Sequence, residues 1–198
     1  MKKYFEIVVM LITWFAILLQ LYILQGSLAN FMSYFTILSN LLVAISLTVI
    51  TFVPHTTIGS FFSKTATKSA IALYILIVGL VYNLVLRGIW EPVGWQLVAD
   101  NLLHVIVPSL YLIYWLLFTP KGALNWADGI SWVYFPLIYL IYSITRGYFT
   151  SWYPYPFINV NELGYREVLI NAGFMTIAFI FIGLLLIALN KMLHRKAN

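Results

Sequence analysis

The feature that most constrains this chain is a series of long apolar runs that contain almost no charged residues. A helix of about 20 apolar residues crosses the ~30 Å hydrocarbon layer of a bilayer and satisfies its own backbone hydrogen bonds there. The sequence therefore predicts an all-α, polytopic membrane protein with six transmembrane helices in one domain that covers residues 1–198. The predicted helices lie at about 4–25, 30–53, 68–87, 98–119, 130–148 and 166–190.

The positive residues predict the orientation of these helices. If both termini are cytoplasmic, eight of the eleven Lys and Arg residues lie inside, which is typical of multi-pass proteins of the cell membrane. The net charge of +5 does not indicate a nucleic-acid partner, because the positive residues sit at helix ends and form no basic stripe. Lipid-facing and partner-facing apolar surfaces look alike, so the sequence leaves the oligomeric state open.

Metal and thiol chemistry have no support in the composition. The chain has no cysteine and only three histidines, which are far apart, so no spacing typical of metal ligands occurs. We expect no metal and no cofactor.

The stretch SYFTILSN begins the second apolar run and crowds polar groups into it. Ser33, Thr36 and Asn40 follow the i, i+3, i+4 spacing of one helical face, and Ser39 lies beside them. With a helix that starts near residue 30, Thr36 lies ~9 Å below the outer interface. Such a Thr more often bonds to its own helix or joins two helices than takes part in chemistry.

The fourth run contains VADNLLHVIVP, in which Asp100, Asn101 and His104 share a helical face. His104 lies ~6 Å below Asp100, at a depth similar to that of Thr36. A histidine inside a membrane is rare and indicates function, although ligand binding or a proton relay fits it as well as catalysis. Asp100 can instead cap the helix. Pro108 predicts a kink with a free His104 carbonyl, which can open a pocket between helices.

Other polar residues also fall in the outer half of the predicted bundle. Asn83 and Arg87 end the third helix, and Arg146 ends the fifth, where the arginines can also simply reach the headgroups. The inner half is predicted to be much poorer in polar groups. Polar side chains at such depth must face protein or water, so we expect them to line one site.

Three pieces of the chain carry a family resemblance, and they are SYFTILSN (33–40), NLLHVIVP (101–108) and RGYFTSWYPYPFINVNELG (146–164). In this order and spacing they resemble the androgen-induced-gene-1-like and androgen-dependent TFPI-regulating-protein-like family, including its bacterial members. The resemblance extends over most of the chain. It implies a six-helix transmembrane threonine hydrolase that cleaves fatty acid esters of hydroxy fatty acids.

The resemblance implies that Thr36 is the nucleophile and His104 its general base, which is chemically consistent because a hydroxyl needs a base to become nucleophilic. Candidates for orienting the base or for holding the oxyanion are Asn40, Asn83, Asp100 and Asn101, and candidates for contacting the substrate are Ser33, Ser39, Arg87 and Arg146. The expected partner is a membrane lipid or a fatty acyl ester. The alternatives are an acyltransferase with the same pocket and a non-catalytic binder or carrier of lipids or small molecules.

Overall fold

Helices account for most of the described residues, as the apolar runs predict. A computed structural model describes residues 1–89 and 91–195, and these residues form helices, turns and bends without a strand. The fold is therefore all-α. The chain divides into two units, Met1–Pro120 and Lys121–Asn198.

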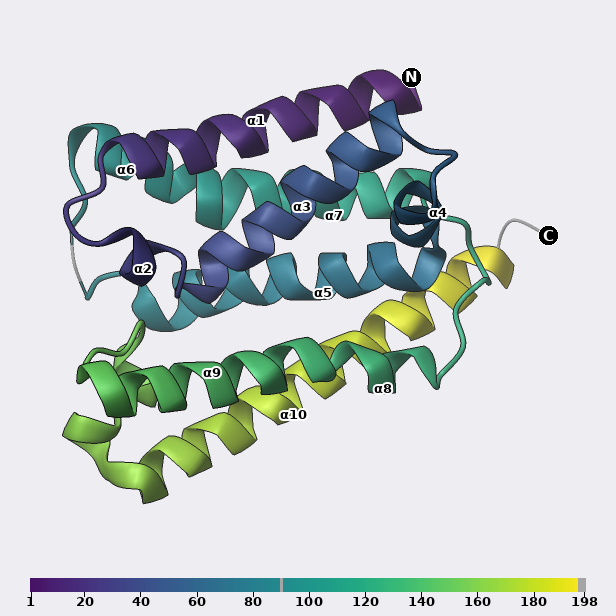
Figure 1. The fold of residues 1–198 in the computed structure, drawn as a ribbon. Coiled ribbons are helices and arrows are strands. Elements are labelled where there is room, and N and C mark those ends of the chain that lie inside the picture. Colours follow the sequence, from purple (N-terminus) through teal and green to yellow (C-terminus); the bar gives the residue numbers. More distant parts are fainter. Residues whose placement is uncertain (90, 196–198) are drawn as a thin grey trace. The chain divides into compact units, whose positions relative to one another are not determined.

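Four of the long helical stretches of the described residues belong to the first unit, whose elements can be followed in Figure 1. Its elements are α1 (Lys2–Tyr22), α2 (Leu28–Phe31), α3 (Phe35–Phe52), α4 (Thr57–Ser63), α5 (Thr65–Val81), the π-helical segment η1 (Tyr82–Leu86), α6 (Gly94–Asn101), the π-helical segment η2 (Leu102–Ile106) and α7 (Val107–Phe118). α1 packs on α3, α3 on α5, α5 on α7 and α7 on α1, which closes a four-membered bundle. Ala16, Ala44 and Ala72 are fully buried, since small side chains let membrane helices approach closely.

The second unit consists of α8 (Asp128–Trp132), α9 (Tyr134–Thr150), the short 3₁₀ turn η3 (Pro156–Ile158) and α10 (Val160–Arg195). α10 packs against α8, α9 and η3. Its first turn is separated from the rest at Gly164, whose φ of 73° lies in the region that glycine tolerates best.

The outer face of α1 is apolar. Val8, Leu11, Phe15 and Leu18 recur every three or four residues and are 52%, 59%, 53% and 57% exposed. A surface helix of a water-soluble protein carries polar residues on that face. This stripe therefore suits contact with lipid.

Among the described residues, five helical stretches are long and apolar enough to cross a membrane: Lys2–Tyr22, Phe35–Phe52, Thr65–Leu86, Gly94–Phe118 and Val160–Arg195. The run predicted at 130–148 falls on α8 and α9, and α9 is only 17 residues long. The sixth crossing stays a prediction.

The predicted helix 30–53 is divided in the structure. Ser27 caps α2 by accepting the Asn30 N–H at 3.1 Å, and Tyr34 is extended before α3 begins. Ser33 thus precedes α3, and Thr36 lies in its first turn. The prediction that Ser33 shares a helical face with Thr36 and Asn40 is wrong, because the extended Tyr34 interrupts the helical spacing between Ser33 and α3.

The fourth predicted helix begins earlier than residue 98. α6 starts at Gly94 after the extended Val93, which makes no side-chain cap. Asp100 is consequently the seventh residue of α6 and is buried, so a capping role for it is excluded.

The end of the first unit at which α1 and α5 begin, which the predicted orientation assigns to the inner half, is not poor in polar groups, contrary to the prediction. α5 begins at Thr65 instead of residue 68, which places Lys68 inside the helix. Lys68 and Glu6 are 4% and 5% exposed, and Ser46 and Ser69 are fully buried. A second polar cluster therefore lies where α1 and α5 begin.

The packing predicts responses of different size at two nearby positions of α1. Ala16→Leu adds bulk to a cluster that includes Ala44 and Leu103, and we expect it to destabilise the protein by about 1–3 kcal/mol. Leu18→Ala removes bulk from the exposed stripe and should change stability by less than about 0.5 kcal/mol. Unfolding in mixed micelles measures both, and equal effects would contradict the assigned inner and outer faces.

Candidate functional site

Thr36 and His104 come together in the first unit although 68 residues separate them. Thr36 Oγ1 lies 3.3 Å from His104 Nε2. Thr36 stands in the first turn of α3 and His104 in the middle of η2. The two side chains remain slightly accessible, with Thr36 8% exposed and the His104 side chain 14% exposed. A hydroxyl and an imidazole nitrogen are thus within reach for proton transfer.

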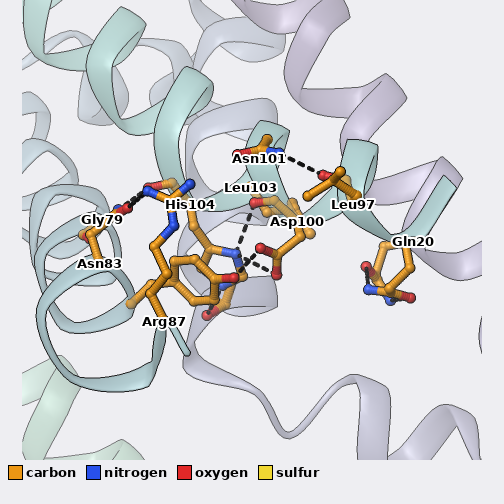
Figure 2. Close-up of polar contacts among 12 residues, drawn as sticks. Gln20, Gly79, Asn83, Arg87, Leu97, Asp100, Asn101, Leu103 and His104 are labelled. Atoms are coloured by element: carbon orange, nitrogen blue, oxygen red, sulfur yellow. Dashed lines mark hydrogen bonds and ion pairs between the residues drawn. The ribbon is translucent and has the colours of Figure 1, made fainter. Parts of the chain in front are cut away.

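Asp100 orients the imidazole from the other side (Figure 2). His104 Nδ1 lies 2.9 Å from the Asp100 carbonyl oxygen and 3.3 Å from the carboxylate Oδ1. Both oxygens accept hydrogen bonds, so Nδ1 carries the proton in the neutral ring. The lone pair of Nε2 then faces the Thr36 hydroxyl, which is the arrangement that a general base requires.

Tyr82 completes this chain of contacts and was not among the predicted site residues. Its hydroxyl donates a hydrogen bond to Asp100 Oδ2, and its ring stacks on His104 with centroids 3.9 Å apart and planes 15° from parallel. Tyr82 belongs to η1 and His104 to η2, and π-helical turns are frequent at functional sites. One feature of the sequence could have indicated Tyr82, because a tyrosine within an apolar helix usually needs a hydrogen-bond partner for its hydroxyl.

The His104 carbonyl is not free, contrary to the prediction from Pro108. The helix does depart from α geometry before Pro108, as the π-helical segment η2. Asn83 Nδ2 donates to that carbonyl at 3.3 Å and to the Gly79 carbonyl at 2.8 Å. A Cβ on Gly79 would lie 3.2 Å from the His104 oxygen, so glycine permits this close approach of α5.

Asn40 performs a similar task on α3. Its Nδ2 donates to the Thr36 carbonyl at 2.8 Å and to the Leu103 carbonyl at 3.3 Å, which ties the first turn of α3 to η2. A side-chain amide has two N–H groups, and those of Asn40 and Asn83 are both used on backbone carbonyls. Neither amide therefore has a donor left for an oxyanion in this arrangement.

Two other predicted residues donate to backbone carbonyls one turn before them, and a third is enclosed in the bundle. Asn101 Nδ2 donates to the Leu97 carbonyl at 2.9 Å (Figure 2). Ser33 Oγ donates to the Ala29 carbonyl at 2.7 Å. Ser39 is fully buried, and its hydroxyl has no partner among the described residues.

The two predicted arginines differ in their surroundings. Arg87 is exposed and donates from Nη1 to Asn83 Oδ1 at 2.8 Å, so it is linked through Asn83 to the backbone of His104. Arg146 belongs to the second unit, where its Cζ lies 4.8 Å from the centroid of the Trp152 ring. The role of Arg146 toward a substrate stays a prediction.

Within residues 1–89 and 91–195, no group of three His, Asp or Glu side chains is placed to hold a metal ion. No family model, no curated protein and no solved structure matches the chain.

The geometry predicts the tautomer of His104. When neutral, His104 should carry its proton on Nδ1 and leave Nε2 bare, because Asp100 supplies only acceptors. ¹⁵N NMR of histidine-labelled protein distinguishes the two ring nitrogens, and His104→Gln identifies the signal. A proton on Nε2 would contradict the arrangement, since Thr36 would then face a donor.

Proposed function

We propose that the protein is an intramembrane hydrolase of lipid esters in which Thr36 is the nucleophile and His104 the general base. The observation that carries the proposal is the continuous line of contacts from Thr36 Oγ1 through His104 to Asp100, within a bundle of apolar helices. The family that the chain resembles uses one Thr and one His, and its motifs here contribute Thr36 and His104.

The proposed reaction begins when His104 Nε2 takes the proton of the Thr36 hydroxyl. Oγ1 then attacks the carbonyl carbon of the ester and forms a tetrahedral intermediate. The intermediate collapses as His104 returns the proton to the leaving alcohol, and an acyl-Thr36 ester remains. Water, deprotonated by the same imidazole, releases the fatty acid and restores the hydroxyl. Asp100 stabilises the imidazolium that forms in both halves of the reaction.

The first turn of α3 supports this chemistry electrostatically. A helix N-terminus carries a partial positive charge, and Thr36 is the second residue of the 18-residue α3. Negative charge that develops on Oγ1 or on the nearby carbonyl oxygen is therefore stabilised. Arg87 adds an exposed cation close to η2, where it can bind an anionic group of the substrate.

The proposed setting is a cell membrane crossed six times, with both termini in the cytoplasm. Within the first unit the charges support this orientation, because Lys2, Lys3, Lys64 and Lys68 belong to the end where α1 and α5 begin. Asp100 and Arg87 belong to the opposite end. The Thr36 site then lies in the outer half of the bilayer, which suits a substrate that enters from the lipid.

A fluorophosphonate that traps activated hydroxyls tests the nucleophile. We expect one covalent adduct on the wild type by intact mass and none on Thr36→Ala. Thr13→Ala is the matched control, because Thr13 is buried and its hydroxyl only bonds to the Val9 carbonyl at 2.7 Å. That control should label like the wild type.

An unlabelled wild type that is folded would refute the activated hydroxyl and favour a non-catalytic lipid binder. An adduct that persists on Thr36→Ala would place the nucleophile elsewhere. Once the adduct is located, the fate of an acyl group on Thr36 separates hydrolysis, which releases the fatty acid, from transfer to a second lipid.

The rate of labelling tests the residues behind the nucleophile. His104→Ala should slow it by about 10²–10⁴-fold, the usual contribution of a general base. Tyr82→Phe removes the hydrogen bond to Asp100 but keeps the ring on His104, so we expect a smaller loss of about tenfold. Tyr22→Phe makes the same change at an exposed residue of α1 and should have no effect. Equal rates for Tyr82→Phe and Tyr22→Phe would remove Tyr82 from the site.

A further inference from the structure

A second buried polar cluster lies at the end of the first unit where α1 and α5 begin and α7 ends (Figure 1). Its acidic member is Glu6, which is 5% exposed. The Tyr114 hydroxyl donates to Glu6 Oε1 at 2.8 Å, and Lys2 Nζ lies 3.8 Å from the same oxygen. Glu6 thus already has both a hydrogen-bond donor and a cation.

Lys68 is the member of this cluster that lacks a bonded partner. Only 4% of the residue is exposed, and the described residues place no acceptor within hydrogen-bond or ion-pair distance of its ammonium group. Lys2 and Glu6 act on it electrostatically with opposite signs. An ammonium group at the end of a largely buried side chain, among apolar helices and without a bonded counter-ion, is costly, so an anion at this place would be stabilising.

The balance of charge at this end also favours an anion. Lys2, Lys3, Lys64 and Lys68 belong to it, and Glu6 is the single acidic residue among the described residues of the helices there. Since Lys2 already pairs with Glu6, the positive charge of Lys68 is not compensated within the cluster.

The start of α5 adds backbone donors to the same place. α5 has 17 residues, and Lys64 at its N-terminal boundary makes no side-chain cap. The N–H groups of a first helical turn and the helix dipole together attract anions, phosphate in particular. Lys68 is the fourth residue of α5, within about one helical turn of these N–H groups.

We propose that Lys68, Lys2 and the first turn of α5 form a binding site for the phosphate group of an anionic phospholipid. The site lies at the end of an apolar bundle, where lipid headgroups meet the ends of membrane helices. A headgroup phosphate supplies the counter-ion that Lys68 lacks. The acyl chains of the same lipid cover the exposed apolar faces of the neighbouring helices. This site is separate from Thr36 and His104 and does not depend on the proposed hydrolysis.

The full-length protein in detergent tests the site by native mass spectrometry, titrated with phosphatidylglycerol or with phosphatidylcholine of the same acyl chains. We expect the wild type to bind phosphatidylglycerol at least about tenfold more tightly. Lys68→Met keeps the length of the side chain without its charge and should abolish this preference. Lys3→Met removes an exposed lysine from the same end and should retain it.

Glu6→Gln tests whether the preference for phosphatidylglycerol increases when negative charge is removed from the cluster. Removal of the carboxylate leaves both lysines without an acid, so the preference for phosphatidylglycerol should increase. Equal affinity of the wild type for the two lipids, or an unchanged preference in Lys68→Met, would overturn the proposal and leave an internal ion network. Displacement of bound lipid by millimolar inorganic phosphate would overturn the lipid assignment and make the site one for soluble phosphate.

Discussion

The carbonyl oxygen of His104 is the acceptor on which the geometry of the candidate site depends. Pro108 has no N–H to donate to it, and a carbonyl left unpaired among apolar helices costs free energy. Asn83 supplies the donor from η1, and Gly79 allows the close approach that this hydrogen bond needs. The backbone carbonyl of His104 therefore binds Asn83 of η1, while its imidazole faces Thr36. As a result, the position of the imidazole ring depends on how α5 and η1 pack.

The same need to satisfy polar groups internally organises the rest of the bundle. Asn40 uses its amide to bind the first turn of α3 to η2, and Tyr82 gives its hydroxyl to Asp100. Between the two polar ends, the helices meet through small buried residues such as Ala44 and turn bulky apolar side chains outward. The two polar clusters thus lie at opposite ends of the bundle, and the middle between them is mostly apolar, with buried hydroxyls such as that of Thr13 bonded to their own helix.

Local spacing explains which parts of the site could be predicted. Asp100 and His104 are one helical turn apart, so their contact follows from the chain itself. The approach of Thr36 to His104 was expected from similar depths, although Thr36 lies nearer the start of its helix than predicted. Tyr82 was missed because its contacts with Asp100 in α6 and His104 in η2 join η1 to elements that are distant from it in sequence. The buried polar cluster around Lys68 was missed because α5 begins three residues before the predicted start.

The sequence by itself determined that the chain is helical and suited to a membrane, because apolar runs of this length with so little charge can bury their backbone only as helices in lipid. It also determined that a hydroxyl, at Thr36, and an imidazole, at His104, are available within the apolar runs. Only the tertiary structure decided the interruption before α3, the use of Asn40 and Asn83 as backbone donors, and the partner of Asp100. These features depend on which carbonyls the neighbouring helices leave unpaired, and hydropathy and spacing along one helix contain no information about that.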